Sequence, residues 1–376
     1  MCDRIYMDHA ATTPMDPEVL EVMRSVASAR YGNASSVYLE GRKSREIVAH
    51  AREQVAALLH AQAEEIYFTS GGTESDNWVI QGIAKKSPRG RILVSAIEHP
   101  AIRRTAMAMA EADVPVTFLP TLADGRVAVD ALEAALSEAV SLVSVMWANN
   151  ETGVLQPIGE IASLCRARGI PMHSDAVQAC GTVAVDVRDT VDYLSLSGHK
   201  LYGPRGIGAL YMRKGRELPP LLYGGHQQDG LRPGTENLQA IAGLGKACEI
   251  AQIHMEERAA HMLVLRERLL AGLRAGIPDL CVFGSLTSRL PGNLAVAIPG
   301  LRSESLLLQL DLEGIAASGG SACNSGSMEP SHVLTAMGIA PSLALDMVRL
   351  TLGKDTTQEE IDRVISVMTA LAGQRA

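Results

Sequence analysis

The sequence predicts an α/β protein in which a mostly parallel β-sheet is covered by helices on both faces. Short apolar runs alternate with amphipathic helical patterns through the first two-thirds of the 376 residues, and this alternation is typical of strand–helix–strand units. Hydrophobic residues make up 47% of the chain and charged residues 20%, which suffices for a large buried core. No run approaches the roughly 20 apolar residues of a transmembrane helix, so no membrane span is expected.

Start signals and periodicity predict the helices. Asp16-Pro17 combines an N-cap residue with proline at the first helical position, which predicts a helix over residues 18–29. A longer amphipathic pattern predicts a helix over 36–60. The stretch from about 236 to 275 is helical and could link two lobes. Further helices are expected from residue 74 and over 158–168, 304–312 and 358–371.

Short apolar runs predict the strands. Continuous apolar runs, without a polar residue at every second position, are typical of strands that are buried on both faces. Such runs in the first two-thirds of the chain cover residues 66–69, 92–94, 116–119, 142–146, 171–173, 193–196 and 207–212. After the long helix, strands are expected near 280–283, 293–298 and 348–351.

Charge and cysteine content exclude several classes of protein. The net charge of −8 argues against a general nucleic-acid binder, which needs a basic face. Residues 1–13 have no apolar signal segment, so we expect a cytoplasmic protein. The six cysteines and ten histidines show no CxxC or HExxH spacing, so neither a metal site nor a disulfide framework is expected.

Lys200 and Asp175 are the first two candidates for catalytic chemistry. Lys200 ends the segment Ser197-Gly198-His199-Lys200, between a predicted strand and a glycine-rich loop. A lysine there can form a Schiff base if desolvation or a cation lowers its pKa from about 10.4; it could also be an ordinary surface lysine. Asp175 ends another predicted strand. It could hold a pyridinium nitrogen protonated, as in pyridoxal-phosphate (PLP) enzymes, or cap the residues after it.

The segment Gly71-Gly72-Thr73-Glu74 predicts a phosphate site. A glycine turn that opens a helix offers free N–H groups and the positive end of the helix dipole. The segment lacks the GxxxxGK[ST] pattern, so a nucleoside-triphosphate loop is not expected. The glycines at 203, 206 and 208 do not form GxGxxG, which argues against a dinucleotide site.

Cys323 differs from the other cysteines by its surroundings. It lies in the stretch 317–327, which has almost no bulky apolar residue, so we expect an exposed and mobile loop. A free thiol there has a pKa of about 8.5 and is a few per cent thiolate at pH 7. The cysteines among apolar neighbours are expected to pack in the core: Cys165, Cys180, Cys248 and Cys281.

Nine segments, in order over nearly the whole chain, resemble the group I (NifS/IscS-type) cysteine desulfurases, which are fold-type I PLP-dependent enzymes. The segments are MDHAATTP (7–14), YGNASSVY (31–38), TSGGTESDN (69–77), EHPA (98–101), MWANNETG (146–153), HSDAVQA (173–179), SGHKLYGPRGIG (197–208), RPGTEN (232–237) and SGSMEPSHVL (325–334). The resemblance implies a large PLP-binding domain over 15–255 with a mostly parallel seven-stranded sheet. It also implies a smaller α+β domain over 256–376, on which residues 1–14 pack.

The resemblance assigns the cofactor-binding residues. Lys200 would bind PLP as a Schiff base, Asp175 would pair with its pyridine nitrogen, and Gln178 would hydrogen-bond its phenolic oxygen. His99 would stack on the ring and help in proton transfer, unless it serves only to start a helix. The phosphate would be held by Gly72, Thr73, Ser197 and His199, and by Thr235 from the partner subunit of a homodimer.

The resemblance also assigns the substrate and the sulfur carrier. Arg349 and Asn149 would bind L-cysteine, with Asn33 as a lesser neighbour of its carboxylate and Asn149 also near the cofactor. The Cys323 thiolate would attack the substrate sulfur, leaving alanine and a persulfide for an acceptor such as an iron–sulfur scaffold protein.

Three other functions stay open at this point. An aminotransferase or a selenocysteine lyase would use the same Lys200 and Asp175, although transamination needs no mobile thiol. A sulfur-relay or scaffold protein with a vestigial PLP fold is the third alternative. Retention of Lys200, Asp175, Gln178 and His99 together argues against an inactive site.

Overall fold

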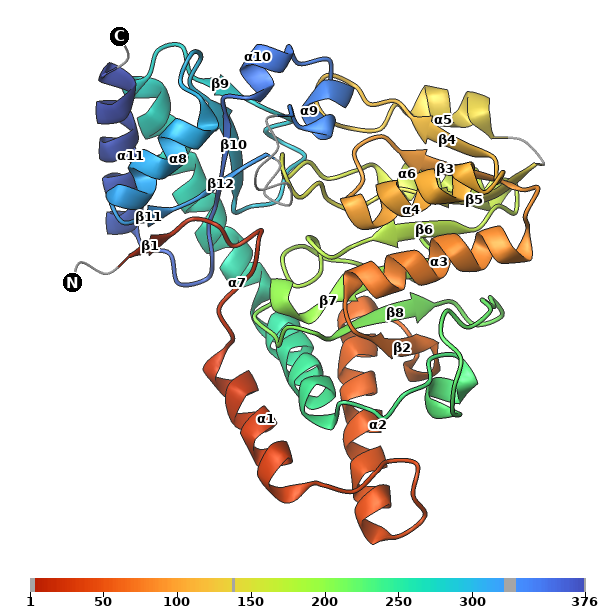
Figure 1. Cartoon of the computed structure of the whole chain (residues 1–376). Helices are drawn as coiled ribbons and strands as arrows, with labels where there is room; N and C mark the ends of the chain where they lie inside the picture. Colours follow the sequence, from red (N-terminus) through yellow and green to blue (C-terminus); the bar gives the residue numbers. More distant parts are fainter. Residues whose placement is uncertain (1–3, 137–138, 321–328, 375–376) are drawn as a thin grey trace.

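A seven-stranded sheet forms the centre of the larger lobe (Figure 1). The computed structural model describes residues 4–136, 139–320 and 329–374. The strands follow the order β2-β8-β7-β6-β5-β3-β4. Neighbours from β7 to β4 pair in parallel, whereas β8 runs antiparallel to both of its neighbours, β7 and β2. Their bounds are β2 Ile66–Thr69, β3 Arg91–Ser95, β4 Val116–Leu119, β5 Val140–Ser144, β6 Met172–Asp175, β7 Tyr193–Ser197 and β8 Gly208–Met212. The predicted mostly parallel α/β sheet is therefore confirmed.

Helices cover both faces of this sheet because neighbouring strand residues point to opposite sides. On one face, Ile92 and Leu142 pack in one core with residues of α3 (Gly72–Lys86) and α4 (Pro100–Glu111). On the other face, Leu93 and Val143 pack in a second core. That core also contains residues of α1 (Pro17–Ala29), α2 (Leu39–Leu59), α5 (Val129–Ala135) and α6 (Ile158–Ala167).

The smaller lobe is built on a four-stranded antiparallel sheet in the order β12-β13-β10-β9. These strands are β9 Cys281–Val282, β10 Asn293–Ala297, β12 Ser318–Gly319 and β13 Met347–Thr351. The helices of this lobe are α8 (Ser303–Leu312), α9 (His332–Ala336), α10 (Pro341–Ala344) and α11 (Gln358–Gly373). The N-terminal strand β1 (Ile5–Tyr6) pairs in parallel with β11 (Ile315–Ala316), so the start of the chain packs on this lobe.

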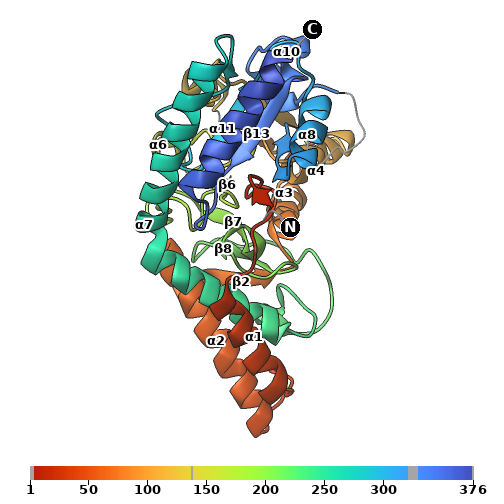
Figure 2. The same ribbon diagram turned by 90° about the vertical axis from the view of Figure 1, so that its left-hand side faces the viewer.

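The helix α7 (Leu238–Gly276) contributes to the cores of both lobes. Ile241 and Leu244 are buried with the helices of the large lobe, whereas Leu265 and Leu269 are buried with β10, β13 and α11. Figure 2 shows α7 running past both lobes. The predicted domain boundary at residues 255 and 256 falls inside this helix and stays a prediction.

Most predicted elements lie within two or three residues of their observed positions. The helix predicted from residue 36 begins at Leu39, because Arg45 Nη1 donates hydrogen bonds to the carbonyls of Ala34 and Ser36 and holds that segment as a loop. The strand predicted over 142–146 is β5, which ends at Ser144. The two-residue strands β1 and β11 are too short for periodicity to predict. Among the described residues, no helix is both long and apolar enough to cross a bilayer.

The parallel strands β3, β5, β6 and β7 end at the same edge of the large sheet, as parallel strands must. In open α/β sheets, ligands bind outside the carboxyl ends of the strands. The N-terminal segment around residues 8–13 and the strand β13 also reach this edge: Asp8 bridges to Thr351, and the Thr13 N–H bonds the His199 carbonyl. The fold therefore predicts a site here.

Gly208 provides a test of the packing at this edge. A Cβ at Gly208 would lie 2.5 Å from the Leu196 carbonyl oxygen and 2.7 Å from the Gly71 Cα, both backbone atoms. We expect Gly208→Ala to lower the free energy of unfolding by about 1–3 kcal/mol, because rigid backbone must move. Denaturant titration measures the change.

Gly159 is the matched control. It lies in the first turn of α6, and a Cβ there meets nothing within 4 Å. Gly159→Ala should leave the stability unchanged or raise it by up to about 1 kcal/mol. Equal effects of the two substitutions would contradict the packing described for Gly208.

Candidate active site

A cavity of about 790 Å³ opens at the carboxyl edge of the large sheet. Its walls come from the N-terminal segment, the turn before α3, the ends of β6 and β7, and the small lobe. Among its lining residues are nine that the sequence predicted as site residues: Gly72, Thr73, His99, Asp175, Gln178, Ser197, His199, Lys200 and Arg349. The structure therefore brings together residues that are far apart in the sequence.

Lys200 is fixed against the N-terminal segment. It ends a single 3₁₀ turn, η2 (Gly198–Lys200), that follows β7 directly. Its Nζ donates hydrogen bonds to the carbonyls of Ala10 at 2.5 Å and Ala11 at 2.8 Å. Gln178 Nε2 donates to the same Ala10 carbonyl at 3.0 Å. The side chain is half-buried, its amine is held by these hydrogen bonds, and it lines the cavity. A lysine that binds a carbonyl compound needs such a position.

Asp175 presents a buried carboxyl group at the end of β6 and is 5% exposed. Its Oδ1 accepts a hydrogen bond from the Val177 N–H at 2.9 Å, so it also caps the turn after the strand. Burial raises the pKa of Asp175 to about 6, while the Val177 N–H and the Lys200 ammonium oppose this rise. Asp175 is therefore mostly ionised at pH 7 and can pair with a cationic ring nitrogen.

His99 is the N-cap of α4, with Nδ1 accepting a hydrogen bond from the Ala101 N–H at 3.2 Å. His99 therefore starts the helix and lines the cavity at the same time. Burial, reinforced by Lys200 and His332, lowers the pKa of His99 to about 4. The imidazole is neutral at pH 7 and can stack on a ring or accept a proton.

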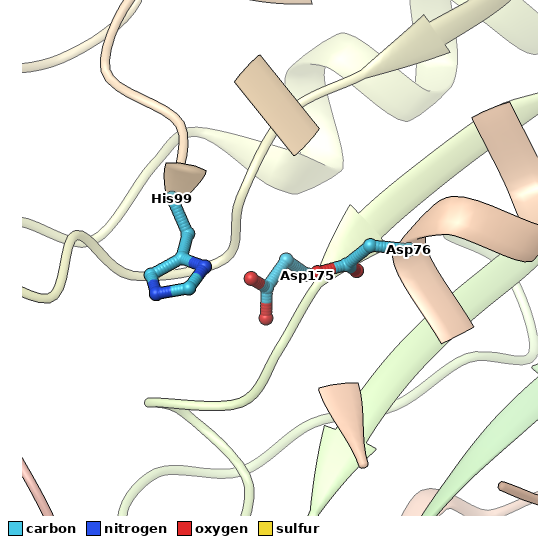
Figure 3. Close-up of side chains that lie close together, drawn as sticks. All are labelled: Asp76, His99 and Asp175. Atoms are coloured by element: carbon cyan, nitrogen blue, oxygen red, sulfur yellow. The ribbon is translucent and has the colours of Figure 1, made fainter. Parts of the chain in front are cut away.

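Asp76 joins His99 and Asp175 in a group whose polar side-chain atoms lie within 4.8 Å of one another (Figure 3). In Figure 3, Asp175 lies between His99 and Asp76. Asp76 was not among the predicted site residues, because an aspartate in a helix usually faces solvent. The available signal was its place on the helix face that carries the apolar Val79, Ile80 and Ile83, one turn after the glycines.

The start of α3 forms a cradle suited to an anion. Gly72 is the first residue of this 15-residue helix, and a Cβ there would lie 2.7 Å from Val177 Cγ2. Glycine therefore lets the helix end approach the turn after β6. Ser197 and His199 face the same side of the cavity, and His199 Nδ1 lies 3.2 Å from Thr12 Oγ1. Helix N–H groups and hydroxyls are the donors that phosphate prefers.

Arg349 projects into the cavity from β13 and is 3% exposed. Its Nη1 donates to the Asn150 carbonyl at 2.7 Å, and its Nη2 pairs with Asp8 Oδ1 at 2.8 Å. Its Nε has no hydrogen-bond partner among the described residues. A buried guanidinium group with an unused donor is suited to a carboxylate ligand.

Two glutamates that were not among the predicted site residues lie buried at the site, Glu151 in the cavity wall and Glu98 behind it. Glu98 Oε1 accepts hydrogen bonds from Ser95 Oγ at 2.5 Å and from the Met146 N–H at 2.6 Å. Glu151 Oε2 accepts one from Ser331 Oγ at 2.5 Å and so ties the two lobes together. Burial raises the pKa of Glu98 to about 8 and that of Glu151 to about 7.

The structure does not bring every predicted residue to this cavity. Asn149 is fully buried behind the wall, where its Oδ1 accepts from the Glu151 and Thr152 N–H groups and its Nδ2 donates to the Ile97 carbonyl. Asn33 and Thr235 are exposed and do not line the cavity. Cys323 lies outside the described residues. Direct roles for these four residues stay predictions.

The residues present fit PLP. The buried carboxylate of Asp175 is available for the pyridine nitrogen. The N-terminus of α3 is open to the phosphate, because Gly72 has no side chain. The amine of Lys200 is held in place for the aldehyde. Neutral His99 completes one side of the space between them.

The chain is similar to known proteins over nearly its whole length. The aminotransferase class-V family model matches residues 5–364. A curated protein of Clostridium botulinum, "Cysteine desulfurase IscS", is 44% identical over 380 residues, which cover 100% of this chain and 96% of that protein.

Two solved structures are similar over most of their length. One, described as "NIFS-LIKE PROTEIN", has a TM-score of 0.93 and 35% identity, covering 98% of this chain and 99% of its own. Another, "SspA in complex with cysteine", has a TM-score of 0.82 and 34% identity, covering 94% and 100%. The fold, the cavity and these similarities lead to one conclusion: the chain belongs to the aminotransferase class-V family and, within it, to the cysteine desulfurases.

Proposed function

We propose that the cavity around Lys200 is the site where this enzyme binds PLP and L-cysteine, and that Cys323 receives the substrate sulfur. The chain is a PLP-dependent cysteine desulfurase, since it shares 44% identity over its whole length with a protein of that name. The observation that supports the placement best is the convergence of Lys200 and Asp175, from the ends of two neighbouring parallel strands, on one buried cavity.

The cofactor would be held at three points. Lys200 would bind it covalently through Nζ, which now lies against the Ala10 and Ala11 carbonyls. Asp175 would face the pyridine nitrogen, and Gln178 would turn from the Ala10 carbonyl toward the phenolic oxygen. The phosphate would lie at the N-terminus of α3, within reach of Gly72, Thr73, Ser197 and His199.

When bound, PLP supplies an electron sink that stabilises negative charge at the α-carbon of an amino acid. The protein's part is to orient the substrate and to move protons. Lys200 Nζ, once released, would carry the proton from the α-carbon. His99, whose pKa is lowered to about 4, stays unprotonated throughout the neutral pH range, so its ring would stack on the cofactor as a neutral imidazole.

Arg349 would orient the substrate by its carboxylate. Its Nη1 and Nη2 contact the Asn150 carbonyl and Asp8, so the substrate would use Nε or displace one of these contacts. Asn149 shapes this wall through the turn 149–152. The amino acid would then lie between Arg349 and Lys200, with its side chain directed away from the sheet.

Cys323 would take the sulfur as a persulfide. Its thiolate attacks the sulfur atom of bound cysteine, the carbon–sulfur bond breaks, and its electron pair stays with the three-carbon fragment that becomes alanine after protonation. Gly320 and Glu329, the described residues on either side of the segment that carries Cys323, both line the cavity.

A homodimer would complete the site. The loop that carries Thr235 is anchored by Gln228, whose Oε1 accepts from Arg52 Nη2 at 3.0 Å and whose Nε2 donates to Glu236 at 2.6 Å. This anchored loop holds Thr235 exposed and away from its own cavity. Apolar side chains are also exposed, among them Tyr31 (87%) and Tyr223 (75%), which suits burial in an interface.

The sulfur would pass to an acceptor protein in the cytoplasm, with iron–sulfur cluster assembly as the destination we favour. A persulfide is a transferable form of sulfur, because an acceptor thiolate can attack it and leave the Cys323 thiolate behind.

Lys200→Ala tests the covalent attachment. After borohydride reduction, mass spectrometry should find PLP on the Lys200 peptide of the unaltered protein and none on the variant. Alanine formation should fall by about 10²–10⁴-fold or more, because the acid–base group is lost with the attachment. The control is Lys86→Ala, an exposed lysine at the end of α3. PLP retained covalently by Lys200→Ala would contradict the assignment.

Cys323→Ser separates sulfur acceptance from substrate binding. Brief exposure to cysteine, alkylation and peptide mapping should show one added sulfur on the Cys323 peptide and alanine in solution. The variant should still change its cofactor absorbance with cysteine but form alanine at least about 10²-fold more slowly. Cys281→Ser, on β9 outside the cavity, should behave like the unaltered enzyme. Normal turnover by Cys323→Ser would rule out this carrier.

Thr235→Ala tests the shared site. Light scattering should give a dimer, and the variant should bind PLP about 10-fold more weakly, since a hydrogen bond to a charged phosphate is lost. Mixing Thr235→Ala with Lys200→Ala subunits should restore one tight site per heterodimer, because one chain supplies Lys200 and its partner Thr235. Failure to restore it would mean that Thr235 acts within its own chain.

A further inference from the structure

Asp76 is a buried carboxyl group that the roles above leave unused. It lies in the second turn of α3 and is 1% exposed. Its Oδ1 has no hydrogen-bond partner among the described residues, although the side chain lines the cavity. An ionised carboxylate in such surroundings is strongly disfavoured, so the protonation state of Asp76 needs an explanation.

The acidic groups that face Asp76 make its ionisation still less favourable. Asp175, on β6, places a carboxylate oxygen within 4.8 Å of an oxygen of Asp76. A hydrogen bond with Ser195 opposes the rise of the Asp76 pKa, and Glu98, which follows β3, adds a smaller effect in the same direction as Asp175. The ammonium group of Lys200 acts on Asp175. The positive charge of Lys200 therefore favours ionisation of Asp175 over ionisation of Asp76.

His173 lies close to Asp76 but does not supply a positive charge. Its Nε2 is 3.7 Å from Asp76 Oδ1. Its two ring nitrogens lie 2.9 Å from Ser144 Oγ and 3.1 Å from Ser195 Oγ. Burial lowers the pKa of His173 to about 3, so the ring is neutral at pH 7 and the contact with Asp76 is not an ion pair.

Two buried carboxyl groups at this distance hold one negative charge between them. We propose that Asp76 is a positioning residue that remains protonated beside Asp175 and so confines the single negative charge of the pair to Asp175. This inference rests on the proposed role of Asp175 as the partner of the cofactor's ring nitrogen. A charged Asp76 would push Asp175 toward protonation, whereas a neutral one leaves Asp175 as the anion that holds that nitrogen protonated.

Infrared spectroscopy of the holoenzyme tests where the proton lies. With ¹³C-labelled aspartate, the unaltered enzyme at pH 7 should show an isotope-shifted C=O stretch of a protonated carboxyl group. The band of Glu98 stays at its unlabelled frequency, because only aspartate carries the label. Asp76→Asn should remove this band and Asp175→Asn should retain it. No band in the unaltered enzyme, or a band that survives Asp76→Asn or is lost in Asp175→Asn, would overturn the proposal.

The pH dependence of thermal stability gives a second measurement. Burial and Asp175 raise the pKa of Asp76 in the folded state above its usual value. The stabilising effect of a raised pKa is complete below the unfolded-state value and is lost as the pH rises toward the folded-state value. Between pH 5 and 8 the holoenzyme should therefore lose Tm relative to its Asp76→Asn variant, by roughly 1–2 °C per pH unit.

Asp192→Asn is the matched control. Asp192 is also buried, but it lies 3.3 Å from Arg213 Nε and 2.9 Å from Arg216 Nε. Its substitution should lower Tm by a constant amount over the same pH range. A constant difference for Asp76→Asn as well would mean that Asp76 is ionised in the folded enzyme, against the proposal. Alanine and persulfide formation by the unaltered enzyme test the proposed function separately.

Discussion

The active site depends on a hydrogen-bonded seam between the N-terminal segment and the turn that carries Lys200. The Thr13 N–H bonds the His199 carbonyl, the Tyr202 N–H bonds Thr13 Oγ1, and Lys200 Nζ bonds the Ala10 and Ala11 carbonyls. The same N-terminal segment pairs with the small lobe through β1 and β11. One short stretch of backbone therefore positions the reactive amine and joins the two lobes around it.

Burial decides the charges around this seam. The imidazoles of His99 and His199 are held neutral, with the pKa of each lowered to about 4, whereas the pKa values of the buried carboxyl groups are raised. The carboxyl groups with pKa values of about 6 to 8 can exchange protons near pH 7, whereas the two imidazoles stay unprotonated. Lys200 and Arg349 share the cavity with three further arginines, Arg103, Arg104 and Arg205, and these cations suit an anionic cofactor and a carboxylate substrate.

Local patterns predicted most of the fold, but not the groups that only tertiary packing brings to the site. Strands and helices were found because apolar runs and start signals are local, and β5 was misplaced by two residues because its apolar run continues into Met146, whose N–H turns to Glu98. Asp175 was found because it ends a predicted strand, and Lys200 because it closely follows one. Arg349 came only from family resemblance, and Asp76 looks like a surface residue until burial is known.

The long helix α7 has a mechanical consequence. At 1.5 Å per residue its 39 residues extend about 58 Å, and its two halves are embedded in different cores. Because both halves are held by packing, α7 resists bending at any single point. A change in the width of the cavity between the lobes would therefore have to be absorbed by small bends distributed along α7 and by the N-terminal segment that also joins the lobes.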